Sequence, residues 1–220
     1  MEENEHFFAT ENQIRAISPR NIGWIERRLP KQAMDHLWKC IENRGESNKR
    51  TLAGNICESN ELIDENNWFF NNILVDLVNQ YASSFINLGN TVPTSCRHPY
   101  ILDTMWVNFQ KQNEFNPVHN HSGVYSFVVW MKIPTTSSEQ NSNPIARDSN
   151  LPCIGNFAFQ YQNIVGDIKS FDYEMSPEME GGMVLFPSKL MHTVYPFFNC
   201  QEERISISGN ISLDTSNALF

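Results

Sequence analysis

The sequence lacks the features of several common protein classes. Its 220 residues contain no run that approaches the roughly 18 consecutive apolar residues of a membrane helix. The chain begins with acidic and polar residues, Met-Glu-Glu-Asn-Glu-His, and not with the basic and apolar segments of a secretory signal. We therefore expect a cytoplasmic protein that has no membrane partner.

Basic residues are also few. The chain has 16 Lys and Arg against 25 Asp and Glu, so its formal net charge is −9. Binding to phosphates requires a basic surface. This charge balance argues against nucleic acid as a general partner. It does not exclude a local basic groove.

The five cysteines are scattered and form no Cys-x-x-Cys pair. They are Cys40, Cys57, Cys96, Cys153 and Cys200. An odd and dispersed set is a poor disulfide framework and a poor zinc-finger framework. We expect reduced thiols that mostly fill the core.

The apolar content is high enough for a folded core. Hydrophobic residues make up 40% of the chain and aromatic residues 12%, which excludes a wholly disordered protein. A chain of this length fits a single domain over 1–220. The change in pattern near residue 92 divides it into a mainly helical layer over 1–95 and a β-rich core over 96–215.

Two helices are expected in the first part, after an irregular lead-in over 1–30. In 31–43, Met34, Leu37, Trp38 and Ile41 recur at the spacing of one helical face. The segment 64–86 has a broader apolar face and begins with Asp64, which suits an N-cap or a first helical turn.

The second part has the period of two that is typical of strands. The segment 124–133 is almost uniformly apolar and predicts a central, buried strand, whereas 135–153 is polar and predicts a loop. Strands without helices between them indicate an antiparallel sandwich or barrel, so the fold class is α+β, with the helices covering one sheet face. The strands are expected at about 103–110, 123–133, 155–161, 183–187, 190–196 and 203–213.

Three of the six histidines form a candidate metal site. His119 and His121 are separated by one residue, so both side chains project to the same side of an extended segment. His192 lies on a later strand. Each feature has a plainer explanation, because His-x-His pairs occur in solvated loops and a lone histidine is often a hydrogen-bonded core residue.

Arg204 begins a cleanly alternating run, twelve residues after His192. Arg204, Ser206, Ser208 and Asn210 face one way, and Ile205, Ile207, Ile211 and Leu213 face the other. On an earlier strand, Trp106, Asn108 and Gln110 also share a face. Each polar face can line a cavity, or it can be the solvent-exposed face of an antiparallel sheet.

The order of these residues resembles that of the Fe(II)- and 2-oxoglutarate-dependent oxygenases. A histidine pair is followed by a distant histidine, then by an arginine about a dozen residues on, with a serine two beyond it. The chain is similar to the prolyl-hydroxylase-like branch, and in particular to small oxygenases of tailed phages with cyanobacterial hosts. The stretches that carry the resemblance are 115–127, 181–187, 192–196 and 204–210.

The resemblance implies a double-stranded β-helix, or jelly roll, that binds Fe(II), 2-oxoglutarate and O₂. It implies that His119, His121 and His192 hold the iron, which leaves other positions open for ligands. Arg204 and Ser206 take the distal carboxylate of 2-oxoglutarate, because an arginine fork binds a carboxylate with two hydrogen bonds. If the face of Trp106, Asn108 and Gln110 lines the cavity, Asn108 or Gln110 can orient 2-oxoglutarate or the substrate.

The sequence departs from the usual His-x-Asp or His-x-Glu pattern, since position 121 is histidine. Three interpretations follow. His119, His121 and His192 form a three-histidine site; or His121-Ser122-Gly123 is the motif, as in oxygenase-like halogenases; or a distant carboxylate such as Glu114 or Asp148 completes the site. We favour the first.

The resemblance implies that 2-oxoglutarate is converted to succinate and CO₂ while a second substrate is hydroxylated. A peptide or prolyl side chain is the first expectation for that substrate, with a nucleotide or a small metabolite as alternatives; a phage protein would act in the host cytoplasm. A non-enzymatic jelly-roll structural or binding module of a phage is the rival from another class. A zinc hydrolase is a second rival, because three histidines and water also make a catalytic zinc site. Neither rival has a use for Arg204.

Overall fold

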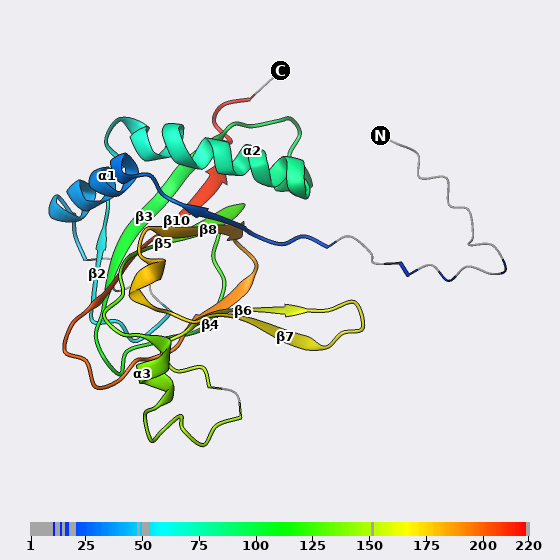
Figure 1. The fold of residues 1–220 in the computed structure, drawn as a ribbon. Helices are drawn as coiled ribbons and strands as arrows, with labels where there is room; N and C mark the ends of the chain where they lie inside the picture. Colours follow the sequence, from blue (N-terminus) through cyan, green and yellow to red (C-terminus); the bar gives the residue numbers. More distant parts are fainter. Residues whose placement is uncertain are drawn as a thin grey trace.

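Two antiparallel sheets form the body of the protein (Figure 1). The computed structural model describes residues 11, 14, 16–17, 21–47, 49, 53–150 and 152–218. The larger sheet has the order β1 (Ile25–Arg28), β8 (Gly182–Pro187), β5 (Tyr125–Lys132), β10 (Arg204–Leu213), β3 (Tyr100–Gln110) and β2 (Glu58–Glu61). The smaller sheet has the order β4 (Asn116–His119), β9 (Met191–Val194), β6 (Phe157–Gln162) and β7 (Ile168–Tyr173).

Strand β10 is the centre of the larger sheet. It pairs with β3 on one side and with β5 on the other, and both ladders are antiparallel. The predicted alternation is present, because Ile207 and Ile211 belong to the buried core while Arg204, Ser206 and Asn210 line a cavity. One sequence pattern therefore gives the strand two different faces.

The helices lie against one face of the larger sheet (Figure 1). They are α1 (Lys31–Glu42) and α2 (Val75–Ser84), the latter preceded by a π-helical turn over Phe70–Leu74. The ring of Tyr81 lies 5.0 Å from that of Tyr125, and the ring of Phe69 lies 5.8 Å from that of Phe127. Helical and sheet residues thus share one buried cluster, which we call the helix-side core.

A second cluster, the intersheet core, lies between the two sheets. Val128 and Trp130 of β5 point into it, together with Phe157 and Phe159 of β6. Phe127 and Val129, the alternate residues of β5, point into the helix-side core. The prediction that this strand is buried on both faces is confirmed, which explains its almost continuous apolar sequence.

The second helix differs from the expectation for 64–86. Asp64 does cap it, since its carboxylate accepts hydrogen bonds from the backbone amides of Phe69 and Phe70, both at 2.9 Å. Asn66 and Asn67 have positive φ, and the 3₁₀ turn Glu65–Asn67 precedes the helix. The helical path therefore starts later than its apolar pattern suggests and includes the π turn.

Several short elements were not among those expected from the sequence, and β4 is one of them. Strand β1 lies within the predicted irregular lead-in, β2 within the predicted helical layer, and β7 at the edge of the smaller sheet. Helix α3 (Ser137–Asn141) lies in the predicted loop 135–153 and carries a capping box between Thr136 and Glu139. Strand β2 reads Glu-Ser-Asn-Glu, so only its pairing with β3 marks it as a strand.

The described residues include no helix of the length and apolar character required to cross a lipid bilayer. Two further 3₁₀ turns in the described part of the chain are Leu88–Thr91 and Pro177–Met179.

The shared helix-side core predicts a single cooperative unfolding transition. Phe69→Ala removes a ring that is 0% exposed, and we expect it to lower the free energy of unfolding by about 3 to 5 kcal/mol. Denaturant titration followed by circular dichroism and by tryptophan fluorescence measures this loss.

The matched control is Phe171→Ala, because Phe171 on β7 is 42% exposed. We expect it to cost less than about 1 kcal/mol. Two separate transitions in the wild-type protein, one for the helices and one for the sheets, would contradict the shared core.

Candidate functional site

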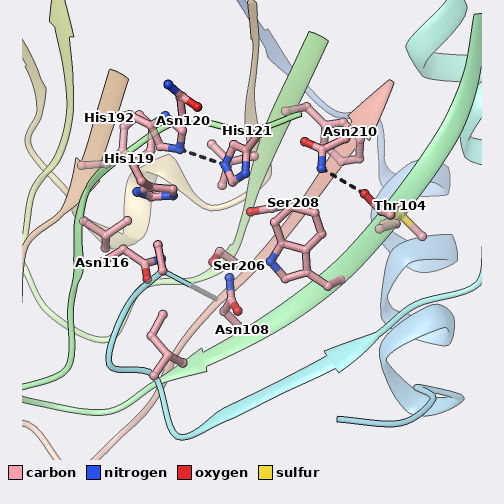
Figure 2. Close-up of a pocket in the computed structure, with 18 of the residues that line it drawn as sticks. Thr104, Asn108, Asn116, His119, Asn120, His121, His192, Ser206, Ser208 and Asn210 are labelled. Carbon is pink, nitrogen blue, oxygen red and sulfur yellow. Dashed lines mark hydrogen bonds between the residues drawn. The ribbon is translucent and has the colours of Figure 1, made fainter. Parts of the chain in front are cut away.

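A cavity of about 670 Å³ opens between the two sheets. Strands β3, β5 and β10 of the larger sheet and β4 and β9 of the smaller sheet contribute to its walls, together with residues 53–62. Figure 2 shows histidine, asparagine, serine and threonine side chains around this space. The predicted polar faces of β3 and β10 thus line a cavity and do not form an ordinary solvated surface.

His119 and His192 lie side by side on neighbouring strands of the smaller sheet. They are register partners in the β4–β9 pairing. The Nδ1 atom of His119 lies 2.7 Å from the carbonyl oxygen of Pro117, and that of His192 lies 2.9 Å from the carbonyl oxygen of Leu190. A proton on each Nδ1 satisfies these contacts and leaves each Nε2 free as a metal ligand.

His121 follows the end of β4 and completes the group. Its backbone amide donates to the carbonyl oxygen of Ser188 at 2.8 Å, which ties it to the loop between β8 and β9. Its Nε2 lies 3.1 Å from Nε2 of His192 (Figure 2). One ring nitrogen from each of the three histidines lies within 4.8 Å of the others, so the structure brings the three predicted residues together.

Burial keeps these three imidazoles neutral. It lowers the pKa of His121 to about 4 and that of His192 to about 3, and it also lowers the pKa of His119. The ring of His192 packs against the rings of Phe157, Phe159 and Phe186. A neutral imidazole is the form that binds a metal ion, so the residues present fit a divalent metal.

Arg204 is a buried cation in the wall of the same cavity. It is 3% exposed, and none of the ion pairs among the described residues includes it. Its Nη2 donates to the carbonyl oxygen of Gly155 at 2.6 Å, its Nη1 donates to Oε1 of Gln110 at 3.4 Å, and Phe197 packs against its plane. Its Nε has no partner within this part of the structure.

Arg204 carries a positive charge at neutral pH, which suits an anionic ligand. Desolvation by burial lowers the pKa of Arg204 to about 10, so the side chain remains charged at neutral pH. An uncompensated buried charge is costly unless a ligand of opposite charge accompanies it. The cavity therefore suits a carboxylate at this position.

Other buried polar atoms along the cavity lack a partner among the described residues. They are Nε1 of Trp106, Oδ1 of Asn108 and Oδ1 of Asn116. Asn108 is the register partner of Ser206, so the two predicted side chains lie next to each other on the cavity wall. Unsatisfied groups gathered at a cavity indicate hydrogen bonds that are made to a ligand.

The structure also bears on the alternative metal ligands. The carboxylate of Glu114 accepts hydrogen bonds from the backbone amides of Cys57 and Lys111, and the Asp148 side chain is 85% exposed beside Arg147. Neither belongs to the histidine group. The interpretation that one of them completes the site is therefore wrong for this arrangement.

Some lining contacts could not be found from the sequence. Gly155 and Phe197 hold the guanidinium of Arg204 from loops that are distant in the chain. Glu61 reaches the cavity only because β2 joins the larger sheet beside β3. The sequence points to Asn116 as a lining residue only through its closeness to the histidine pair.

The comparisons with known proteins agree with this arrangement. Residues 104–210 match the family model described as "Putative 2OG-Fe(II) oxygenase". These residues extend from the middle of β3 to near the end of β10 and contain the three histidines and Arg204. The match supports the 2OG-Fe(II) oxygenase superfamily.

Several solved structures resemble this chain, and one with a TM-score above 0.5 supports a shared fold. A 2OG-Fe(II) oxygenase family oxidoreductase from Burkholderia pseudomallei has a TM-score of 0.51 and 13% identity, and the match covers 86% of this chain and 84% of that one. A Pseudomonas putida prolyl-4-hydroxylase has a TM-score of 0.48 and 14% identity, with 87% and 92% covered. The viral collagen prolyl hydroxylase of Paramecium Bursaria Chlorella virus-1 has a TM-score of 0.45 and 13% identity, with 86% and 94% covered.

No curated protein matches the sequence. The 2OG-Fe(II) oxygenase superfamily implies Fe(II), 2-oxoglutarate and O₂, and the histidine group of this chain fits metal binding.

The histidine group predicts one metal ion per chain. We expect the purified protein to bind one equivalent of Ni(II), a stable substitute for Fe(II), and His192→Ala to lower this affinity by more than about 100-fold. Titration calorimetry and the metal content after dialysis measure both quantities.

His98→Ala is the matched control, because His98 bonds to the backbone of Asn217 and lies outside the histidine group. His119→Ala separates the remaining interpretations. It loses the metal if three histidines bind it, and retains it if only His121 and His192 do.

Proposed function

We propose that this protein is an Fe(II)- and 2-oxoglutarate-dependent dioxygenase that hydroxylates a second substrate and releases succinate and CO₂. The observation that carries the proposal is the buried and uncompensated charge of Arg204 in a cavity that also holds three neutral histidines. A metal site alone would fit many proteins. A metal site that shares a cavity with a fixed carboxylate receptor fits a co-substrate that carries both a chelating group and a distal carboxylate.

His119, His121 and His192 would hold the iron. Their Nδ1 contacts with backbone carbonyls fix the rings of two of them, so little ordering is required when the metal binds. When bound, the iron supplies oxidative chemistry with O₂ that no protein side chain can provide. The three ligands are neutral, so they leave the full positive charge of the metal to attract an anionic co-substrate.

Arg204 and Ser206 would bind the distal carboxylate of 2-oxoglutarate. The guanidinium is already oriented by Gly155 and Phe197, and its Nε has no partner in the described structure. Asn108, next to Ser206 on the cavity wall, would orient the co-substrate through its amide. The aromatic rings around His192 would exclude water from the histidine group.

The same proposal includes the finer features expected from the sequence. They are a double-stranded β-helix over 96–215, a single domain over 1–220, a relation to phage oxygenases and an action in the cytoplasm. The helix-side core, shared by helices and sheet, supports the single domain. A non-enzymatic module is not favoured, and a zinc hydrolase would have no need of Arg204 in the cavity.

The proposal is tested by adding Fe(II) and 2-oxoglutarate to the metal-free protein without oxygen. Chelation of iron by the keto acid is expected to give a weak visible charge-transfer band, and His192→Ala is expected to lose it. A folded wild-type protein that binds Fe(II) but shows no band with 2-oxoglutarate would overturn the proposal and favour the zinc alternative.

The role of Arg204 gives a separate prediction. Arg204→Lys keeps a positive charge but loses the planar fork, so we expect 2-oxoglutarate to bind at least about tenfold more weakly. Ni(II) affinity is expected to stay unchanged, because Arg204 is not in the histidine group. Calorimetric titration of the Ni(II)-loaded protein with 2-oxoglutarate measures this.

Arg97→Lys is the control for this variant, since Arg97 is an exposed loop residue. Equal 2-oxoglutarate affinity in wild type and a folded Arg204→Lys variant would show that the carboxylate receptor lies elsewhere.

A further inference from the structure

The cavity extends well beyond the space between Arg204 and the histidines. Along β10, at about 3.3 Å per residue, the backbone of Asn210 lies about 20 Å from that of Arg204. Both residues line the cavity. Figure 2 shows Thr104 and Asn210 at one side of the view, away from Asn108, Ser206 and Asn116. We call the Thr104 and Asn210 end, with Trp106, Asp103 and Glu61, the outer wing.

A hydrogen-bond chain that is buried at Ser126 and Asn210 reaches the exposed Thr104 and fixes this side of the outer wing. Oδ1 of Asn210 accepts from the hydroxyl of Ser126 at 2.7 Å, and Nδ2 of Asn210 donates to Oγ1 of Thr104 at 3.0 Å. The hydroxyl of Ser126 lies 3.0 Å from that of Ser188, whose carbonyl oxygen binds the amide of His121. Because Oγ1 of Thr104 accepts a bond from Asn210, its own proton is available to a ligand.

Trp106 adds a second donor on the side of the outer wing that is nearest to His121. Its ring lies 5.6 Å from that of His121, and the residue is 7% exposed. Its Nε1 is buried and has no partner among the residues that the structure describes. An indole N–H can only donate, so it calls for an acceptor such as a carbonyl oxygen on the ligand.

The charges of the outer wing have one sign. Glu61 and Asp103 are the charged residues that line it, and Arg204, at the other end, is the cation of the lining. Neither acid takes part in an ion pair among the described residues; Asp103 accepts only a hydrogen bond from the hydroxyl of Ser212. The cavity is therefore positive where an anionic co-substrate would bind and negative at its other end.

We propose that the outer wing binds the primary substrate through a positively charged nitrogen group, an ammonium or a guanidinium, that accompanies a carbonyl group. Glu61 and Asp103 receive the cation, while Trp106 and Thr104 donate to the carbonyl. The substrate is thus a basic amino acid, either free or as a residue in a peptide. This inference rests on the proposed function, because it assigns the inner end of the cavity to 2-oxoglutarate.

Matched probes test the proposed charge preference. The Ni(II)-loaded protein with saturating 2-oxoglutarate is titrated with Nα-acetyl-lysine methylamide, its arginine analogue, and the norleucine analogue that lacks the charge. We expect the better of the two cationic probes to bind at least about tenfold more tightly than the norleucine probe. In the double variant Glu61→Gln/Asp103→Asn this preference is expected to fall below about threefold.

The control is Glu42→Gln/Asp76→Asn, which removes the same charge from exposed positions on the helices and outside the cavity. It is expected to retain the preference. Equal binding of charged and uncharged probes, no binding of any probe, or a preference that survives Glu61→Gln/Asp103→Asn would each overturn the proposal.

Two further arms identify the source of the basic group. Free lysine is compared with a blocked pentapeptide that has lysine at its centre; tighter binding of one identifies a free amino acid or a peptide as the substrate. The 2-oxoglutarate affinity of Glu61→Gln/Asp103→Asn is measured in parallel and is expected to equal that of wild type. A failed charge preference with intact 2-oxoglutarate binding rejects the outer wing alone, whereas absent 2-oxoglutarate binding in wild type rejects the proposed function.

Discussion

The double pairing of β10 is the constraint on which the rest of the structure depends. Because β3 and β5 flank it, its side chains can point only into the cavity or into the helix-side core. Gly209 is required in mid-strand, since a Cβ there would lie 2.6 Å from the ring of Phe127. That ring in turn packs against Phe69 beneath the helices. The residues that shape the site and those that stabilise the fold are therefore set by one strand.

The cavity wall carries free-energy costs that the cores must offset. A buried guanidinium without an acid and several unpartnered amide and indole groups all lose hydration without full compensation. Such groups persist because packing on both faces of β5 and on the helix side of β10 holds their backbones in place. Their common location in one cavity is the physical reason to assign them to ligands rather than to stability.

The sequence predicted the parts of the site that depend on local alternation. The spacing of His119 and His121 and the alternating run from Arg204 follow directly from the two-residue period of a strand. The contacts of Arg204 with Gly155 and Phe197 and the position of Glu61 on β2 arise from packing between distant segments. No local pattern encodes those contacts. The late helix start after Asn66 follows from a positive φ that its apolar pattern does not reveal.

The histidine at position 121 changes the charge balance of the entire cavity. A site with a carboxylate ligand, a divalent metal, one arginine and a doubly charged 2-oxoglutarate is formally neutral. In the proposed site, neutral His121 in place of that carboxylate would leave one positive charge at the inner end. Glu61 and Asp103 add two negative charges at the outer wing. The cavity with metal and 2-oxoglutarate would then have a net charge of −1. A substrate with a single cationic group restores neutrality, which links the departure at position 121 to the acidic outer wing.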